Sequence, residues 1–128
     1  MRYHGIVFIV ALLNGCAYIE ISARQQRLDD ILWGYTKAMT WSDLATAHSA
    51  TRVAQAGAIP FPDIKVTAYE PTTQRIEENG RTLKRIVQIR YVHNTRMVEH
   101  TLSIEEVWKY SDESKHWQLE SGFPSFKY

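Results

Sequence analysis

His100 is the residue best placed to do chemistry in the predicted core of this chain. The pattern puts it on the inward side of a strand, near Tyr91 and Trp108, where an imidazole can act as a base or orient a ligand. His48, on a short predicted helix, can line the same cavity. For both histidines the commoner role is that of a buried side chain hydrogen-bonded within the core. These four residues define a candidate pocket lining, and a structural role is the alternative.

The other reactive side chains do not form a recognisable site. Glu105 and Glu106 are adjacent, and neighbouring strand residues point to opposite faces, so we expect one to be solvated and the other to mark a local bend. The five histidines lack short ligand spacings and a companion cysteine, so no metal is expected. Phosphate-binding glycine loops and Ser or Cys nucleophile motifs are also absent from the sequence. We therefore predict no catalytic residue and no cofactor.

Two helices are predicted before the strands. Apolar residues recur at three- and four-residue steps over about sixteen residues from Ala23. This spacing predicts an amphipathic helix with an inward face of Leu28, Ile31, Leu32, Tyr35, Ala38 and Met39. Ser42 is predicted to cap a second helix that ends within residues 53–57. Residues 60–62, Pro-Phe-Pro, then turn the chain into the sheet. The inward positions of the second helix are Leu44, Ala47 and His48 or Thr51.

The first predicted strand alternates, with Ile64, Val66 and Ala68 inward. Pro71 should break or bulge this strand, so we expect the strand to lie at an edge of the sheet or to be kinked there. Asn79-Gly80 is the strongest hairpin signal in the chain. This turn pairs Ile76 with Leu83 and Ala68 with Tyr91.

Two further turns continue the sheet. A hairpin at Asn94-Thr95 would pair Arg90 with Glu99, Ile89 with His100 and Tyr91 with Val98. A turn at residues 111–116 would bring Tyr110 to Trp117 and Trp108 to Leu119, and residues 122–126 should pack over one end of the sheet. The resulting apolar face consists of Leu83, Val87, Ile89, Tyr91, Val98, Leu102 and Ile104.

The amino terminus has the layout of a secretory signal. Arg2 and the terminal amine are positive, and residues 6–13 form an unbroken apolar run. Eight helical residues span roughly 12 Å, whereas the hydrocarbon core of a bilayer is about 30 Å thick. This segment is therefore predicted to direct export and not to span a membrane.

Leu13-Asn14-Gly15-Cys16 resembles the lipobox of bacterial lipoproteins. The resemblance implies a diacylglycerol thioether on Cys16, cleavage between Gly15 and Cys16, and acylation of the new amino terminus. Cys16 is the only cysteine, so a disulfide framework is impossible. Ala17, where an Asp would direct retention in the inner membrane, resembles an outer-membrane signal of Gram-negative bacteria. The alternative is an ordinary secreted protein with a stray cysteine.

These signals divide the chain into a signal peptide (1–15), a lipidated tether (16–23) and one domain (24–128). The 15 basic residues include Arg2, so the mature chain balances its 14 acidic residues. No run of like charge stands out, and nucleic acid is not an expected partner. Fifteen aromatic residues indicate a well-filled core or a lined pocket.

The order of the elements predicts an α+β fold, with helices on a curved antiparallel sheet. The junction at residues 35–44 (Tyr-Thr-Lys-Ala-Met-Thr-Trp-Ser-Asp-Leu) and the hairpin series 64–122 are similar to the cone-shaped nuclear transport factor 2-like, or ketosteroid isomerase-like, fold. The mature chain also resembles small bacterial lipoproteins of this architecture. The nuclear transport factor 2-like family includes isomerases, dehydratases, ligand binders and non-catalytic assembly modules. The isomerase triad of one Tyr and two Asp has no counterpart here, so no catalytic residue is transferred.

From these features we predict a lipoprotein anchored in the membrane on the periplasmic face of the outer membrane. It would be a non-catalytic docking or accessory module with an envelope protein partner. The alternative is a binder of, or an enzyme acting on, a small apolar ligand in the cone of the sheet. Ile86, Val92 and Met97 on the outer sheet face also suggest a homodimer.

Overall fold

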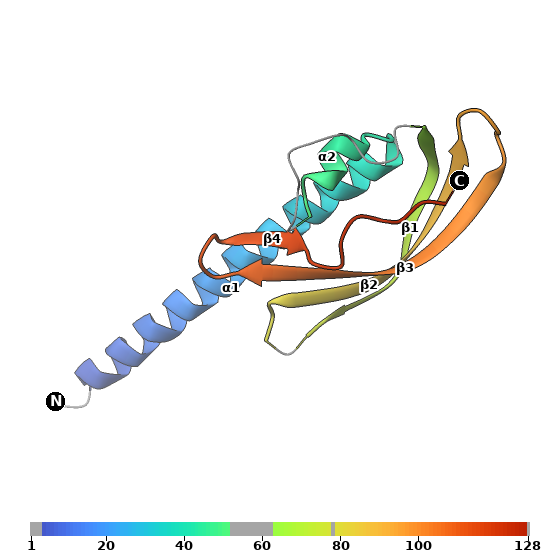
Figure 1. Cartoon of the computed structure of the whole chain (residues 1–128). Helices are drawn as coiled ribbons and strands as arrows, with labels where there is room; N and C mark the ends of the chain where they lie inside the picture. The colour runs from blue at the N-terminus through green and yellow to red at the C-terminus, as the bar shows by residue number, and fades with distance from the viewer. Residues whose placement is uncertain (1–3, 52–62, 78, 128) are drawn as a thin grey trace.

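A computed structural model describes the backbone of residues 4–51, 63–77 and 79–127, and side chains from Tyr18 onward within these ranges. The helices are α1 (His4–Thr40) and α2 (Leu44–His48). The strands β1 (Ile64–Ile76), β2 (Thr82–His93), β3 (Glu99–Ser111) and β4 (His116–Leu119) form one antiparallel sheet in that order (Figure 1). The predicted α+β class, with a helix packed on an antiparallel sheet, is confirmed.

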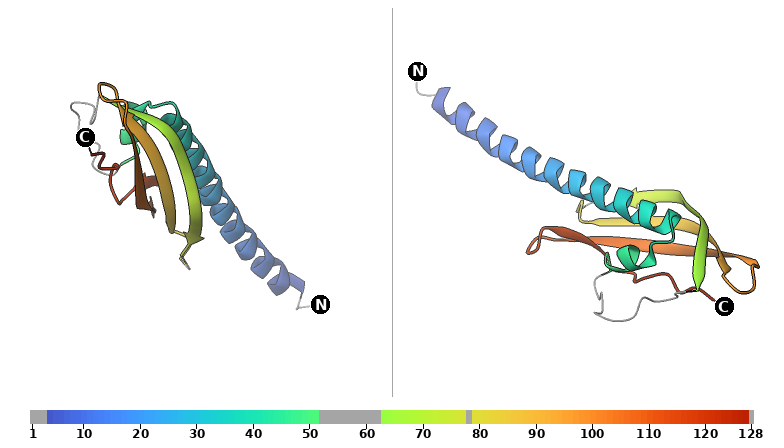
Figure 2. Two further views of the ribbon diagram at one scale, coloured as in Figure 1. Left: turned by 90° about the vertical axis from the view of Figure 1, so that its right-hand side faces the viewer. Right: turned by 90° about the horizontal axis from the view of Figure 1, so that it is seen from above.

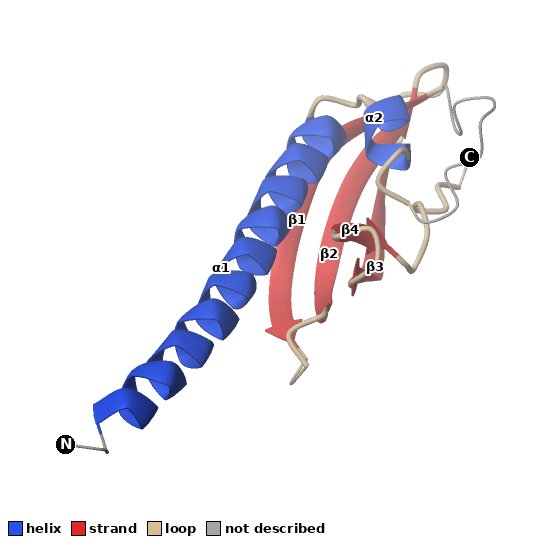
Figure 3. Ribbon diagram, turned by 90° about the vertical axis from the view of Figure 1, so that its left-hand side faces the viewer, coloured by secondary structure: helices blue, strands red, loops and turns tan. Residues whose placement is uncertain are grey.

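The C-terminal half of helix α1 packs along one face of the sheet, next to β1, and α2 lies beside the C-terminal end of α1 (Figure 3). The buried residues of α1 belong to its predicted inward face and are Leu28, Tyr35, Ala38 and Met39. The helix begins well before the predicted Ala23, so residues 17–22, expected to be a tether, are helical. Residues 16–33 contain neither Gly nor Pro, so nothing in this part of the sequence breaks the helix.

The junction between the helices differs from the prediction. Asp43, and not Ser42, caps α2, because its carboxylate accepts hydrogen bonds from the Thr46 backbone N–H (3.3 Å) and hydroxyl (2.6 Å). Ser42 has a left-handed backbone (φ +59°), and its hydroxyl bonds to the backbone of Val66 (2.9 Å from N–H, 3.2 Å to C=O). The helix ends at His48 and so does not reach residues 53–57. The predicted turn at residues 60–62 lies outside the described residues.

Strand β1 is an edge strand with two irregularities in its pairing. The irregularity beside Pro71 and the edge position confirm the prediction made from that proline, whereas the irregularity after Val66 was not predicted. The hairpin register is confirmed near the turn, where Ile76 pairs with Leu83 and Gly80 adopts a left-handed φ of +65°. Irregularities between Pro71 and Thr73 and between Val66 and Ala68 each shift the pairing by one residue. Ala68 therefore opposes Arg90, not Tyr91. The shift turns Tyr69, which the alternation placed outward, into the core.

The β2–β3 hairpin was predicted two residues out of register. Arg90 pairs with Thr101, Tyr91 with His100, and Ile89 with Leu102. The connection at residues 94–98 is longer than the predicted turn and is closed by Met97 N–H donating to the His93 carbonyl (3.0 Å). A two-residue shift keeps each side chain on its face. Val98, however, lies in this connection and is exposed instead of joining the core.

The last strand and the C-terminal residues complete the core as predicted. Trp108 pairs with Leu119 and Tyr110 with Trp117. Phe126 is buried in the same core cluster as α1, α2 and the sheet, so residues 122–127 pack against one end of the sheet. Figure 2 shows that the N-terminal half of α1 extends beyond the sheet. Among the described residues, no helix is both long and apolar enough to cross a bilayer.

Candidate functional site

A buried pair of opposite charges lies on the inner face of the sheet. Arg85 of β2 and Glu106 of β3 are direct cross-strand partners, and their residues are only 4% and 0% exposed. The Arg85 Nε atom donates a hydrogen bond of 2.6 Å to Glu106 Oε1. Removing two charges from water costs several kcal/mol each, so such a pair persists only when other hydrogen bonds complete it.

Two aromatic side chains supply those hydrogen bonds. The Tyr69 hydroxyl donates to Glu106 Oε2 at 2.6 Å and accepts from Arg85 Nη2 at 2.7 Å. The Trp108 indole Nε1 donates to Glu106 Oε1 at 3.1 Å. The carboxylate thus accepts three hydrogen bonds, one of them from a cation. We call Tyr35, Tyr69, Arg85, Glu106 and Trp108 the inner polar cluster.

Tyr35 joins the inner polar cluster from α1 through its ring. Its ring meets those of Trp108 (centroids 5.1 Å apart) and Tyr69 (5.9 Å apart) edge-to-face. Its buried hydroxyl has no hydrogen-bond partner among the described residues. Tyr35 therefore contributes apolar packing together with an uncompensated polar atom.

The electrostatics keep both phenols protonated. Burial raises the pKa of Tyr35 and Tyr69 well above the ordinary tyrosine value, and the Glu106 charge raises it further. The Arg85 charge opposes this shift without cancelling it. Tyr69 consequently remains a proton donor to Glu106, as the hydrogen-bond geometry requires.

The inner polar cluster is a closed network rather than a poised acid or base. Glu106 and Arg85 satisfy each other and Tyr69, and all three are buried between the sheet and α1. Directional bonds of this kind fix one register of β1, β2 and β3 against one another. The observed hydrogen bonds therefore fit a structural role, in which the cluster fixes how the three strands pack.

Sequence reasoning missed this cluster, although a signal for it was present. Arg85 lies between the inward positions Leu83 and Val87, and Glu106 between Ile104 and Trp108, so each strand carries one charge on its apolar side. The prediction that one of Glu105 and Glu106 marks a bend is wrong. Both lie in regular β3, with Glu105 exposed and Glu106 buried.

The predicted pocket lining is only partly brought together. Tyr91 and His100 are cross-strand partners with stacked rings 5.3 Å apart. Trp108 is eight residues further along β3, roughly 27 Å at about 3.4 Å per residue, so it belongs to the inner polar cluster instead. The predicted grouping of Trp108 with His100 is therefore wrong, because an extended strand separates them.

C-terminal aromatic residues occupy the space beside Tyr91. Phe126 meets the Tyr91 ring edge-to-face at 4.9 Å, and Phe123 meets His48 at 5.4 Å. The Tyr91 hydroxyl accepts from the Lys127 N–H (2.9 Å) and donates to the Lys127 carbonyl (3.0 Å). We call Phe123, Phe126 and Lys127 the tail plug. His48 and Tyr91 thus contact the tail plug, and His100 stacks on Tyr91.

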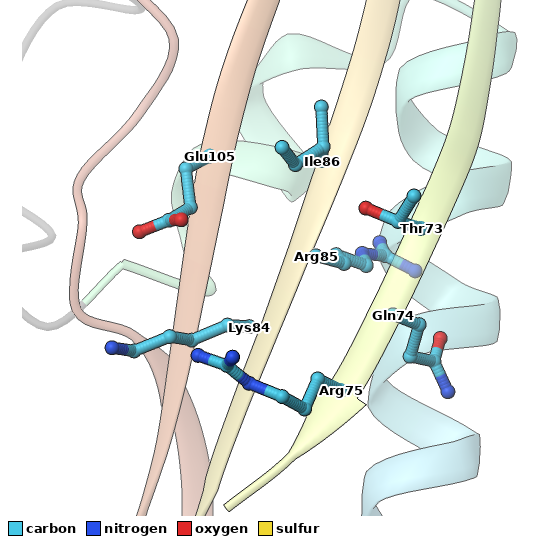
Figure 4. Close-up of a pocket in the computed structure, with 7 residues that line it drawn as sticks. All are labelled: Thr73, Gln74, Arg75, Lys84, Arg85, Ile86 and Glu105. Carbon is cyan, nitrogen blue, oxygen red and sulfur yellow. The ribbon is translucent and has the colours of Figure 1, made fainter.

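The outer face of the sheet carries a groove of about 280 Å³ (Figure 4). Arg75, Lys84 and Glu105 border it, and Glu77 forms ion pairs with both Arg75 (3.3 Å) and Lys84 (3.4 Å). Arg85 also lines the groove, and its charge is paired with Glu106. Three cations are thus matched by the carboxylates of Glu77, Glu105 and Glu106, so this region has no net charge to select an ion. Figure 4 shows the Arg85 side chain directed away from those of Arg75, Lys84 and Glu105.

The residues that suggested a dimer are dispersed. Ile86 is exposed on the outer face, Val92 is buried, and Met97 is exposed in the β2–β3 connection.

Among residues with described side chains, no group of three His, Cys, Asp or Glu lies together as metal ligands would.

Residues 13–16, which resemble a lipobox, lie within α1. Cys16 precedes Arg24 by eight residues, and Arg24 is the first of the described side chains of α1 that contacts the sheet. Arg24 lies over the Tyr110 ring (5.8 Å), and its carbonyl accepts a hydrogen bond from Trp117 Nε1 (3.0 Å).

Comparison of the chain with protein-family models, with curated proteins and with solved structures finds no match in any of the three.

Proposed function

We propose that this chain is a lipoprotein that is anchored through Cys16 to the periplasmic face of the outer membrane of a Gram-negative bacterium. In this proposal its α+β domain is a non-catalytic docking or accessory module of the envelope. The observation that carries the proposal is the lipobox-like sequence Leu13-Asn14-Gly15-Cys16, which lies in the part of α1 that precedes the packed domain. Lipidation there would place the domain in the periplasm.

Two structural features support the docking role over the ligand-binding alternative. The tail plug fills the inner face beside Tyr91, and the inner polar cluster fills it beside Trp108. The charged groups that would serve as catalysts on this face, Arg85 and Glu106, are committed to each other. The exposed features are instead on the outside, where Trp33 and Trp41 are each more than two-thirds exposed on or just after α1. Exposed tryptophans are characteristic of protein-binding surfaces.

The anchor is tested with the full chain expressed with its own signal in a Gram-negative host. The parent should incorporate labelled palmitate, fractionate with the outer membrane, and accumulate as a precursor when lipoprotein signal peptidase is inhibited. Cys16→Ser should abolish palmitate incorporation and outer-membrane fractionation, and the unlipidated precursor should accumulate whether or not the peptidase is inhibited. Cys16→Ser/Ser22→Cys is a matched control, because it restores a cysteine to the same helix outside the lipobox and should not regain lipid. Cys16→Ser protein that still fractionates with the outer membrane would refute the proposal.

The docking role is tested on the lipidated protein in native membranes. A photo-crosslinking residue at Trp33 or Trp41 should give one adduct of defined mass with another envelope protein. The same residue at Glu113, exposed in the β3–β4 turn, is the control. Native mass spectrometry of the detergent-extracted protein supplies the opposite test. A small molecule that is retained and then lost on denaturation would favour the ligand-binding alternative.

A further inference from the structure

The turns of α1 that follow Cys16 expose large apolar side chains to solvent. Tyr18, Ile19 and Ile21 are 72%, 67% and 51% exposed. All described residues from Tyr18 to Ala23 are exposed, and the contacts with the sheet begin at Arg24. This cluster, which we call the anchor-proximal patch, is thus a helical surface that the domain leaves uncovered.

The helix gives the anchor-proximal patch a preferred side. At about 100° per residue, Tyr18 lies between Ile21 and Ile19 around the helix axis, and Glu20 lies nearly opposite their centre. The segment therefore has an apolar side and a single charged residue facing away from it. Tyrosine and isoleucine on one side of a helix are suited to the boundary between lipid head groups and acyl chains.

The distance from Cys16 fits the same boundary. Tyr18 to Ile21 lie roughly 3–8 Å along the helix from Cys16, at about 1.5 Å per residue. The polar layer on each side of a bilayer is about 5–8 Å thick. A lipid chain on Cys16 would consequently hold these side chains within that layer.

The rest of α1 argues against a helix lying flat on the membrane. Asp29 and Asp30 are exposed, as are Gln26, Lys37 and Thr40, and anionic lipids would repel the two carboxylates. Apolar exposure before Arg24 is continuous with the anchor. Further along the exposed face, Trp33 is the one large apolar side chain that is more than half exposed, and polar residues precede and follow it.

We propose that the anchor-proximal patch is buried in the interfacial layer of the bilayer, so that α1 leaves the membrane as a rigid spacer. This inference rests on the proposed lipidation of Cys16. Leu28, the first buried residue among the described side chains of α1, then stands about 18 Å along the helix from the lipidated residue. The domain is held at a set height and tilt, in contrast to a domain on a flexible tether.

The test uses the lipidated full chain in vesicles of phosphatidylethanolamine and phosphatidylglycerol. Cys16 is blocked by its thioether, so a single new cysteine at Ile19 or Ile21 can be labelled with an environment-sensitive fluorophore. Gln26→Cys is the matched control, because it lies on nearly the same side of the helix as Ile19, two turns further on. We expect lipids brominated near the head group to quench the probe at least threefold more at positions 19 and 21 than at position 26.

The outcomes separate this inference from the proposed function. Lipidated protein with equally weak quenching at positions 19, 21 and 26 would overturn the inference and leave the anchor intact. Failure of palmitate incorporation would overturn both. Thiols at positions 19 and 21 that resist an impermeant reagent in native membranes, yet are not quenched in pure vesicles, would show that a protein covers the patch, and would also overturn the inference.

Discussion

The inner face of the sheet is closed by hydrogen-bonded charges around Glu106 and by apolar rings around Tyr91. At the first end, three strands contribute polar groups that bond to one another in the inner polar cluster. At the second, residues distant in sequence supply the tail plug, which contacts Tyr91 through Phe126 and Lys127. The first closure depends on paired buried charges, while the second combines apolar packing with two hydrogen bonds between Tyr91 and the Lys127 backbone.

Because of this difference, we expect substitutions at the two ends to lower the stability of the domain in different ways. A charged network fails when one member is lost, because the remaining charge stays buried without its partner. An apolar plug fails in proportion to the volume removed, and the surroundings can partly collapse to compensate. The predictions below use this contrast.

Glu106→Leu should cause the largest loss. It leaves Arg85 buried without a counter-ion, so the free energy of unfolding should fall by about 3–5 kcal/mol in urea titrations. The double variant Arg85→Met/Glu106→Leu should recover part of this loss, because it removes both charges but leaves the Tyr69 hydroxyl and the Trp108 indole N–H without these partners. If the single and double variants are equally unstable, the loss comes from packing and not from the unpaired charge.

Phe126→Ala should reduce the free energy of unfolding by about 3 kcal/mol and leave a cavity beside Tyr91. The half-buried Phe123→Ala is the smaller-effect comparison. Apolar fluorescent probes should bind the Phe126→Ala variant and not the parent. Binding by the parent itself would contradict a filled inner face and revive the ligand-binding alternative.

Alkaline pH should destabilise the inner polar cluster more than the tail plug. The folded-state pKa of Tyr35 and Tyr69 is raised, whereas in the unfolded chain both titrate near the ordinary value of about 10. Their contribution is therefore complete below about pH 10 and is lost as pH rises above it, by about 1.4 kcal/mol per pH unit for each tyrosine. Urea titrations from pH 8 to 11 should show a shallower decline for Tyr35→Phe/Tyr69→Phe. An unchanged slope would contradict the burial of both phenols.

The two tyrosines of the inner polar cluster should respond in opposite directions to loss of the hydroxyl. Tyr69→Phe removes a donor to Glu106 and should cost about 1–3 kcal/mol, while Tyr35→Phe removes an unpaired buried hydroxyl and should stabilise by about 1 kcal/mol. Thermal unfolding of both variants at neutral pH measures the difference. A destabilised Tyr35→Phe would mean that water or another group satisfies its hydroxyl.

Local patterns in the sequence were sufficient for much of the fold. Asn79-Gly80 predicted the Ile76–Leu83 pairing, because a tight turn fixes the register of the residues beside it. Helical periodicity likewise predicted the face containing Leu28, Tyr35 and Met39. These features depend on residues close together in the chain.

The inner polar cluster could not be predicted in the same way. With the β2–β3 hairpin two residues out of register, Arg85 faced Ile104, and the complementary charge of Glu106 was not apparent. Tyr69 was assigned to the outer face because the bulge after Val66 has no clear sequence signature. One register error and one bulge thus concealed the whole cluster.

The sequence by itself determined the lipobox resemblance, the α+β class and the apolar faces, since each follows from residue order or short-range periodicity. Only the tertiary structure decided which strand residues meet, that Arg85 and Glu106 satisfy each other, and that Phe126 closes the end beside Tyr91. The physical reason is that register and burial depend on contacts between distant segments. A shift of one residue changes which face a side chain occupies, and a shift of two changes its partner.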